Sequence, residues 1–258
     1  MGVLEKFRLN GKKAFITGGA GGIGKAMAQA LLEAGADVAI VDINLEAAQA
    51  AVDELSDIGP KVIAVQADVT NEDAVTGMVD TIVDAFGRID IAFANAGITM
   101  NIPAEDMSFT DWKKVIDLNL NSVFLTDKAA AKAMIQQGDG GAIVNTGSMS
   151  GSIVNTPQPQ SSYNASKAAV IHLSKSLAFE WAQHNIRVNT ISPGYIGTDL
   201  LYKNEKLKPL IPEWEAVTPQ KRLGKPEDLQ ATAVLLASDA SAYATGTDVI
   251  IDGGYTIV

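Results

Sequence analysis

The sequence predicts a Rossmann-like α/β fold, in which one doubly wound sheet of seven parallel strands carries helices on both faces. Three observations support this prediction. Short runs of β-branched and apolar residues recur along the 258-residue chain, and longer alanine-rich segments typical of helices separate them. The runs are apolar almost throughout, which indicates strands buried on both faces. A glycine-rich turn follows the first run, and an acidic residue ends the second.

The predicted strands and helices alternate in chain order. The strands are residues 14–16, 38–41, 62–65, 89–93, 142–144, 186–191 and 249–251. The first predicted helix begins near Ile23, and the others cover residues 45–55, 111–137 and 162–184. Because βαβ crossovers are right-handed, such helices cover both faces of the sheet. An eight-stranded α/β barrel is the alternative layout, but the glycine-rich turn after the first strand favours the open sheet.

Composition and charge argue against several classes of function. The formal net charge of −10 opposes binding to nucleic acid, which usually requires a basic face. The chain has no cysteine, and its two histidines, His172 and His184, lie outside any carboxylate cluster, so we expect no metal site. No apolar run approaches the roughly 20 residues that span a membrane, and the first residues do not resemble a signal peptide. We therefore expect a single cytoplasmic domain over residues 1–258 with no membrane partner.

Two irregular stretches follow the fifth and sixth predicted strands, at residues 151–160 and about 195–225. Ligands of open α/β sheets bind beyond the carboxyl ends of the strands, so both stretches should flank the active site. The second stretch is more apolar than a solvated loop requires, which predicts a substrate lid or a subunit contact. Its large apolar residues are Leu200, Leu201, Tyr202, Leu207, Leu210, Ile211 and Trp214.

Five glycines lie within residues 18–24, where the first strand turns into a helix. Glycines let backbone amides approach a pyrophosphate at the helix N-terminus, so Gly18, Gly22 and Gly24 predict a dinucleotide site. A literal G-x-G-x-x-G pattern begins at Gly19, so the pattern alone does not assign a role to each glycine. The alternative is a tight turn without a ligand.

Asp42 ends the second strand, eighteen residues beyond Gly24. A carboxylate at this place accepts hydrogen bonds from the ribose hydroxyls of NAD and repels the 2′-phosphate of NADP. Residues 26–60 contain no lysine or arginine to neutralise that phosphate, and Lys25 is the nearest cation. We therefore expect NAD. Asp42 could instead cap the helix over residues 45–55, a role that Asn44 could also fill.

Tyr163 and Lys167 are four residues apart and so share one face of a predicted helix, with β-carbons about 5–6 Å apart. A cation beside a phenol lowers its pKa from about 10, which would make the Tyr163 hydroxyl a proton donor and acceptor nearer neutral pH. Ser148 precedes Tyr163 by fifteen residues. Together with the glycine-rich turn, these residues predict an enzyme that transfers hydride, although a Y-x-x-x-K pattern alone also occurs on ordinary amphipathic helices.

With these motifs in this order, the chain resembles the short-chain dehydrogenase/reductase family along essentially its whole length. The resemblance implies a nicotinamide cofactor. The cofactor-binding residues that it implies are Gly18, Gly22, Ile23, Gly24, Asp42, Ile43, Asp68, Val69, Asn95, Ala96, Gly97, Tyr163, Lys167, Pro193, Gly194, Ile196 and Thr198. The catalytic residues that it implies are Asn119, Ser148, Tyr163 and Lys167.

The resemblance also implies how the catalytic residues work. Tyr163 would supply a proton to a carbonyl oxygen that Ser148 holds by a hydrogen bond. Lys167 would bind the nicotinamide ribose and lower the pKa of Tyr163. Asn119 would hold a water that connects Lys167 to solvent.

The predicted substrate is a polyol or the corresponding ketose. Residues 151–160 place amide side chains between Ser148 and Tyr163, and amides both donate to and accept from sugar hydroxyls. The run Pro157-Gln158-Pro159-Gln160 also resembles the polyol and ketose branch of the family. The alternative is that these amides belong to an ordinary solvated loop. The candidate substrate contacts are Ser148, Ser150, Asn155, Gln160, Tyr163 and Tyr195.

Two other functions stay open. A reductase of 3-oxoacyl thioesters should show a basic patch at the mouth of its site and usually prefers NADPH, whereas here Lys203, Lys206 and Lys208 are interspersed with acidic residues. A non-catalytic NAD-binding sensor or scaffold would not need Tyr163. The resemblance implies a homotetramer, in which the helices over residues 111–137 and 162–184 could pack across two-fold axes. The apolar residues 256–258 predict a buried C-terminus at a second interface.

Overall fold

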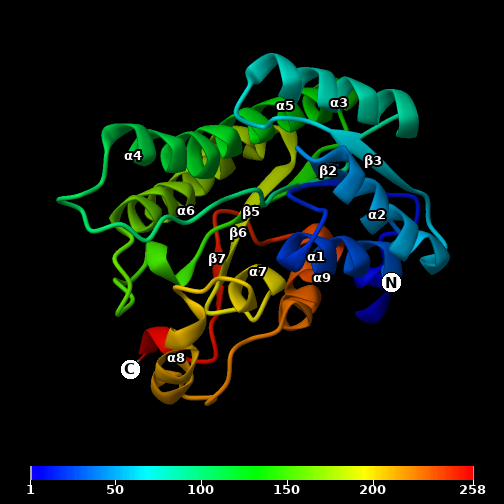
Figure 1. Cartoon of the computed structure of the whole chain (residues 1–258). Helices are drawn as coiled ribbons and strands as arrows, with labels where there is room; N and C mark the ends of the chain where they lie inside the picture. The colour runs from blue at the N-terminus through cyan, green and yellow to red at the C-terminus, as the bar shows by residue number, and fades with distance from the viewer. Residues whose placement is uncertain (1, 258) are drawn as a thin grey trace.

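The computed structural model describes residues 2–257, apart from the side chain of Leu200, and places seven parallel strands in one sheet (Figure 1). The strand order is β3-β2-β1-β4-β5-β6-β7, so the chain winds outward from β1 in one direction and then from β4 in the other. The predicted fold class is therefore confirmed. The strands are β1 (Lys13–Thr17), β2 (Asp37–Asp42), β3 (Val62–Gln66), β4 (Ile91–Ala94), β5 (Gly141–Thr146), β6 (Ile186–Pro193) and β7 (Asp248–Ile251).

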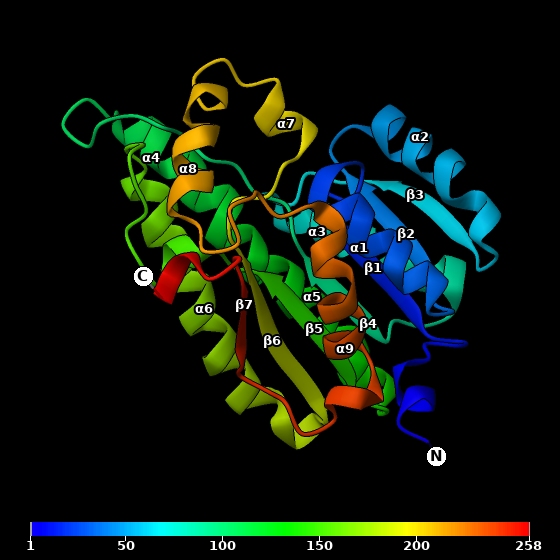
Figure 2. The ribbon, with the colours of Figure 1, turned by 90° about the horizontal axis from the view of Figure 1, so that it is seen from below.

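Helices cover both faces of the sheet, as predicted (Figure 2). Helices α1 (Gly22–Glu33), α2 (Leu45–Leu55) and α9 (Gln230–Ala237) pack on one face. Helices α3 (Glu72–Phe86), α5 (Ser122–Gln137) and α6 (Ser161–Trp181) pack on the other. Successive strand residues point to opposite faces, so Ala14 and Ile16 join the first core cluster and Phe15 joins the second. Burial on both faces explains the almost continuous apolar strands.

Helix covers all of the predicted range 111–137, but it is not α-helical throughout. Helix α4 (Phe109–Ile116) runs into a π-helical segment, Asp117–Asn121, before α5 begins. A π-helix bonds each residue to the fifth one along instead of the fourth, and this local change was not predicted from the sequence. The π-helical segment contains Asn119, whose side chain is fully buried.

The fourth strand begins two residues later than predicted, at Ile91. The backbone of Ile89 is bonded by a side chain instead of by a neighbouring strand, because its N–H donates to Gln137 Oε1 at 2.9 Å and its carbonyl accepts from Gln137 Nε2 at 2.7 Å. The C-terminal end of α5 thereby closes the entry to β4.

The two irregular stretches follow β5 and β6 as predicted, and both lie beyond the carboxyl ends of the strands. The second contains helices α7 (Asp199–Tyr202) and α8 (Ile211–Val217), which stand above this end of the sheet (Figure 2). We refer to residues 198–217 as the lid. Among residues 2–257, no helix is long and apolar enough to cross a bilayer.

A fully buried acid lies between α5, β5 and α6. Asn145 Nδ2 donates to Asp127 Oδ2 at 2.7 Å and to Ser174 Oγ at 2.9 Å. The other oxygens, Asp127 Oδ1 and Asn145 Oδ1, are buried acceptors that have no hydrogen-bond partner within residues 2–257. Burial raises the pKa of Asp127 to about 8, and the hydrogen bond from Asn145 opposes this rise. A proton on Asp127 would therefore supply a hydrogen-bond donor at a place where two buried oxygens, Asp127 Oδ1 and Asn145 Oδ1, have none.

The proton on Asp127 predicts a pH dependence of stability. The pKa is about 8 in the folded chain against 3.8 for a free carboxyl, so the folded state holds a proton that the unfolded state releases between these values. The free energy of unfolding should therefore fall by about 1.4 kcal/mol per pH unit from this group as the pH rises through that window. Asp127→Asn should remove this slope, and its stability relative to the wild type should grow by up to about 4 kcal/mol between pH 5 and pH 8.

Urea unfolding at several pH values measures this effect. The exposed Asp57 provides the control, because Asp57→Asn should keep the slope of the wild type. Parallel curves for the wild type and Asp127→Asn across this range would show that Asp127 is ionised in the folded chain.

Candidate active site

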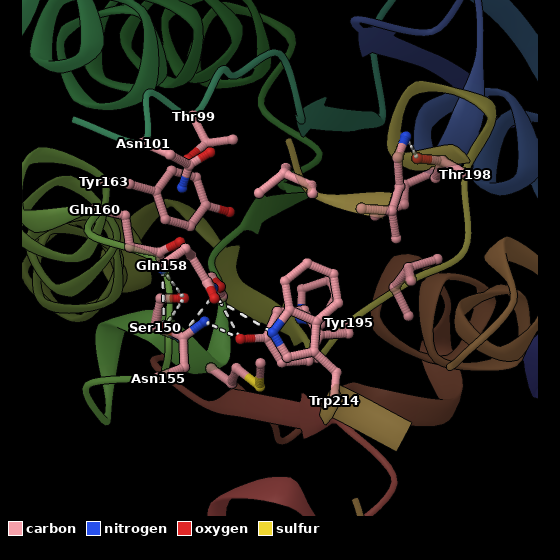
Figure 3. Close-up of a pocket in the computed structure, with 18 of the residues that line it drawn as sticks. Thr99, Asn101, Ser150, Asn155, Gln158, Gln160, Tyr163, Tyr195, Thr198 and Trp214 are labelled. Carbon is pink, nitrogen blue, oxygen red and sulfur yellow. Dashed lines mark hydrogen bonds between the residues drawn. The ribbon is translucent and has the colours of Figure 1, made fainter. Parts of the chain in front are cut away.

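A pocket of about 400 Å³ opens beyond the carboxyl ends of β4, β5 and β6 (Figure 3). Its walls come from the segment after β4, the segment after β5, the start of α6 and the chain from the end of β6 through the lid. Ligands of open α/β sheets bind at this edge, where the strand order reverses. The pocket is therefore the candidate active site.

The structure brings Ser148 and Tyr163 to the same pocket. Ser148 begins the segment after β5, and Tyr163 lies in the first turn of α6. Lys167 lies one turn further along α6 and is only 3% exposed. Its Nζ donates to the carbonyl oxygen of Thr146 at 2.7 Å and lies 5.7 Å from the centre of the Tyr163 ring. Two pocket hydroxyls and one buried amine thus form a compact group.

The expectation that the pKa of Tyr163 is lowered is wrong for this arrangement. Tyr163 is partly exposed toward the pocket, but protein surrounds its phenol closely enough that burial raises the pKa of the hydroxyl, while the Ser148 side chain lowers it. Burial also lowers the pKa of Lys167 to about 8, which weakens its positive charge near neutral pH. Desolvation therefore outweighs the hydrogen bond from Ser148, and Tyr163 keeps its proton at neutral pH.

Asn119 binds the segment after β4 and contacts the helix that carries Lys167. Its Oδ1 accepts from the N–H of Ile98 and its Nδ2 donates to the carbonyl of Ile98, both at 2.8 Å. The same Nδ2 lies 3.1 Å from Ser166 Oγ, next to Lys167. Gly97 packs on this amide, since a Cβ there would lie 3.2 Å from Asn119 Oδ1. The predicted role of Asn119 in holding a water stays a prediction.

The glycine turn between β1 and α1 fits a dinucleotide. A Cβ at Gly24 would collide with the carbonyl oxygen of Gly18, so only glycine lets α1 approach the turn this closely. Gly18 and Gly22 have φ values of 62° and 52°, which a residue with a side chain rarely adopts. The N-cap of α1 is Gly21, and no side chain bonds the first N–H groups of the helix. Backbone donors at a helix N-terminus suit a pyrophosphate.

Asn95 joins this turn to the rest of the site. Its Nδ2 donates to the carbonyls of Thr17 at 3.0 Å and Gly18 at 3.2 Å, and its Oδ1 accepts from Thr146 Oγ1 at 3.1 Å. The N–H of Ala96 donates to Thr17 Oγ1. The predicted residues Asn95, Ala96 and Gly97 thus connect the ends of β1, β4 and β5 before the chain reaches the pocket wall.

Asp42 does not cap α2. That role belongs to Asn44, whose Oδ1 accepts from the N–H of Ala47 at 3.1 Å. Asp42 Oδ1 accepts only a 3.1 Å bond from the N–H of Asn44, and Ile43 beside it is 64% exposed. Lys25, the nearest cation expected from the sequence, is paired with Glu54 at 2.6 Å. The end of β2 therefore presents an acidic and otherwise open surface.

The other predicted cofactor residues lie at the same edge of the sheet. Asp68 follows β3 and accepts from the N–H and hydroxyl of Thr70, while Val69 is buried. Pro193 ends β6 and, with Gly194, Ile196 and Thr198, lines the pocket, as does Ile23 from α1. Thr198 caps α7 and also contacts the glycine turn, because a Cβ at Gly22 would lie 3.4 Å from Thr198 Cγ2.

The amide side chains predicted to bind substrate are bonded mainly to one another (Figure 3). Gln160 Nε2 lies within hydrogen-bonding distance of Ser150 Oγ, Asn155 Oδ1 and Asn164 Oδ1. Ser150 Oγ donates to Asn155 Oδ1 at 2.8 Å. These residues line the pocket, as predicted, but much of their hydrogen-bonding capacity is already used. Their contact with substrate stays a prediction.

Tyr195 is held by the same network. Its hydroxyl accepts from Asn155 Nδ2 at 2.9 Å and from Gln158 Nε2 at 2.8 Å, and donates to the carbonyl of Thr156 at 3.2 Å. Gln158 Oε1 also accepts from Trp214 Nε1 at 3.2 Å. The rings of Tyr195 and Trp214 stack with centres 4.0 Å apart. Tyr195 therefore offers its ring to the pocket, because its hydroxyl is fully bonded.

Some apolar residues of the second irregular stretch lie at the pocket, and both predicted roles, a substrate lid and a subunit contact, stay predictions. Leu201, Leu207 and Trp214 line the pocket, and Trp214 is almost fully buried. Tyr202 is half exposed, and Leu210 and Ile211 are partly buried. The side chain of Leu200 lies outside the described part of the chain. Gln158 ties the lid to the segment after β5 through its bond with Trp214.

Sequence reasoning missed the wall formed by the segment after β4. Ile98, Thr99 and Asn101 line the pocket, yet none was a candidate. Their position directly after the Asn95-Ala96-Gly97 motif, at the carboxyl end of a central strand, was the available signal. No group of three or more metal-ligating side chains occurs within residues 2–257.

Comparisons with known proteins cover nearly the whole chain. A family model described as enoyl-(acyl carrier protein) reductase matches residues 18–256. The galactitol 2-dehydrogenase of Rhizobium johnstonii is 42% identical over 257 residues, which are 99% of this chain and 99% of that protein. A probable NADP-dependent mannitol dehydrogenase of Yarrowia lipolytica is 44% identical over 259 residues, covering 98% of this chain and 90% of that protein.

The fold also matches solved structures. The crystal structure of a short-chain type dehydrogenase/reductase from Mycobacterium marinum superposes with a TM-score of 0.97 and 47% sequence identity, and the match covers 100% of both chains.

Because Gln158 bonds three other side chains, we expect its replacement to lower the stability of the folded chain. Gln158→Met keeps the approximate size of the side chain but removes its bonds to Gln160, Tyr195 and Trp214. We expect the free energy of unfolding to fall by about 1–3 kcal/mol, because buried polar partners are left unpaired. The fluorescence of Trp214 should shift to the red as the lid loosens.

Gln183→Met is the matched control, since Gln183 is exposed and contacts only the carbonyl of Glu180. Equal stability of both variants and an unchanged emission spectrum would show that the network does not hold the lid.

Proposed function

The chain belongs to the short-chain dehydrogenase/reductase family, and from that premise we propose that it is an NAD(H)-dependent oxidoreductase that interconverts a polyol and a ketose. The chain is accordingly an oxidoreductase that acts on CH–OH groups, and its fold binds a nicotinamide cofactor. The observation that carries the proposal is the meeting of Ser148 and Tyr163 in one pocket, with Lys167 beside them.

In this proposal, Tyr163 is the general acid and base. Burial keeps its hydroxyl protonated near neutral pH, so it can give a proton to a carbonyl oxygen during reduction. Ser148 holds that oxygen by a hydrogen bond. Lys167 is anchored to the carbonyl of Thr146, which fixes its amine near the Tyr163 ring. In the direction of oxidation, Tyr163 takes the proton back from the alcohol.

The glycine turn and the residues around it would hold the cofactor. Gly18, Gly22 and Gly24 keep the backbone open for a pyrophosphate, and Asp42 faces the place where a ribose follows in this fold. The end of β6, with Pro193 and Gly194, would receive the nicotinamide. A bound nicotinamide supplies or accepts the hydride. The lid excludes water from this side of the pocket through Leu201, Leu207 and Trp214.

NAD is favoured over NADP by the surroundings of Asp42. Its carboxylate opposes a 2′-phosphate, and Lys25 is engaged by Glu54 instead of being free to neutralise one. The Yarrowia lipolytica relative is named as NADP-dependent, so the preference of this chain is tested directly below.

A polyol substrate is supported by the relatives and by the polar walls of the pocket. The names of the relatives describe enzymes that act on galactitol and mannitol. A thioester reductase should show a basic patch at the mouth, whereas Lys203 is paired with Asp199 at 3.0 Å and the other two lysines of this stretch are interspersed with acidic residues. A sensor or scaffold would not need Ser148 and Tyr163 in one pocket.

The proposal includes a homotetramer in the cytoplasm, both of which stay predictions. Exposed aromatic side chains on α4, α5 and α6, namely Phe109, Phe124 and Phe179, support an assembly that would cover them. Ile257 is exposed, and Val258 lies outside the described residues, so the predicted burial of the C-terminus at an interface also stays a prediction.

The first test is the rate of NADH oxidation with a panel of ketoses and acetoacetyl thioesters, for the wild type and for Tyr163→Phe. We expect turnover of a ketose, and a fall in kcat by a factor of about 10²–10⁴ in the variant, because the ring stays but the proton donor is lost. NADH binding should be retained.

Tyr243→Phe serves as the control, since Tyr243 is fully exposed. A thioester preference would replace the polyol proposal with the thioester alternative. NADH binding without turnover of any substrate would favour the sensor.

Asp42→Asn tests the cofactor preference. The variant keeps the oxygen that accepts from Asn44 but removes the negative charge. The ratio of kcat/KM with NADH to kcat/KM with NADPH should fall at least about tenfold, which corresponds to about 1.4 kcal/mol of lost repulsion. Asp53→Asn, on the exposed face of α2, should leave the ratio as in the wild type. A wild-type preference for NADPH would contradict the role of Asp42 outright.

A further inference from the structure

Five amide side chains line the pocket, and four of them have hydrogen-bond partners within the protein. Asn155, Gln158 and Gln160 belong to the network around Tyr195. Asn204 Oδ1 accepts from the N–H groups of Lys206 and Leu207 at 3.0 and 3.1 Å.

Asn101 differs from the other four. Its Nδ2 is buried and, among the described residues, has no hydrogen-bond partner. It lies on the same side of the pocket as Tyr163 and Thr99 (Figure 3). A buried donor without an acceptor destabilises the folded chain, so such groups are rare outside functional sites. Asn101 lines the pocket, so a turn of its amide about the side-chain bonds would bring this donor to an acceptor carried by a ligand.

The backbone around Asn101 is well anchored, so its side chain is not simply part of a free loop. Asn119 bonds both backbone groups of Ile98, three residues earlier. Ser108 caps α4 by accepting from the N–H of Asp111 and so closes the other end of the segment. Asn101 therefore lies in a segment whose two ends are fixed by contacts that do not use its amide.

We propose that Asn101 is a specificity-determining residue, whose amide donates a hydrogen bond to a hydroxyl oxygen of the polyol or ketose close to the carbon that reacts. This inference rests on the proposed function. The network around Tyr195 then has a different task, which is to hold the Tyr195 and Trp214 rings as a rigid wall. Recognition of hydroxyls and shaping of the pocket are thus divided between opposite sides of the site.

This division has a consequence for substrate choice. A substrate with a hydroxyl near its carbonyl satisfies the Asn101 donor, whereas a plain ketone leaves that donor buried and unpaired. Loss of the Asn101 amide should therefore lower the rate with hydroxylated substrates much more than the rate with plain ketones. Loss of a network amide should lower both rates in the same proportion.

The test measures kcat/KM with NADH for a ketose, the best of fructose, sorbose and xylulose, and for 2-hexanone. The variants are Asn101→Leu, which keeps the size of the side chain, and Asn101→Ala, which leaves space if leucine blocks the pocket. Gln158→Met is the matched comparison from the network. Circular dichroism confirms that each variant is folded.

We expect the ratio of ketose to 2-hexanone activity to fall about tenfold in both Asn101 variants and to stay at its wild-type value in Gln158→Met. An equal loss for both substrates in the Asn101 variants would overturn the inference, because it would indicate a purely structural role. If the wild type reduces 2-hexanone but no ketose, the proposed function fails and this inference fails with it.

Discussion

The two hydrogen bonds between the amide of Asn119 and the backbone of Ile98 organise the site more than any other contact. They fix one wall of the pocket, and the same amide touches Ser166 beside Lys167. Asn119 can reach these groups because it lies in a π-helical segment between α4 and α5. A local departure from α-helical geometry thus connects the segment after β4 to the helix that carries Tyr163 and Lys167, as is frequent for π-bulges at functional sites.

Electrostatics in the site follow from burial more than from pairing. Lys167 is held by a carbonyl instead of a carboxylate, and burial lowers its pKa while raising that of Tyr163. Both shifts favour the neutral form of the group. The same effect acts on Asp127 in the core. Its partner Asn145 directly precedes Thr146, whose carbonyl anchors Lys167. Burial therefore shifts all three groups toward their neutral forms.

Much of the fold could be predicted from the sequence, because apolar strand runs and glycine turns act locally. Seven strands, the turn at Gly18 to Gly24 and the cap at Asn44 all depend on residues close together in the chain. The π-helical segment was not predicted, because it is a change in backbone hydrogen bonding that the composition of the region does not reveal. The pKa of Tyr163 was predicted in the wrong direction because sequence spacing places Lys167 nearby but says nothing of desolvation. Asn101 was overlooked because the sequence does not show which amides are hydrogen-bonded within the protein. Only the structure shows that the Asn101 Nδ2 donor has no partner among the described residues.

The collision that any side chain at Gly24 would make with Gly18 limits how this protein can evolve. Every substitution there would push α1 away from the turn, so the turn proposed to hold the pyrophosphate is closed to change. The end of β2 is different, because Asp42 is only lightly bonded and Ile43 is largely exposed. A change of dinucleotide during evolution should therefore alter Asp42 and Ile43. Relatives that use another cofactor should differ at these two positions and keep the glycine turn.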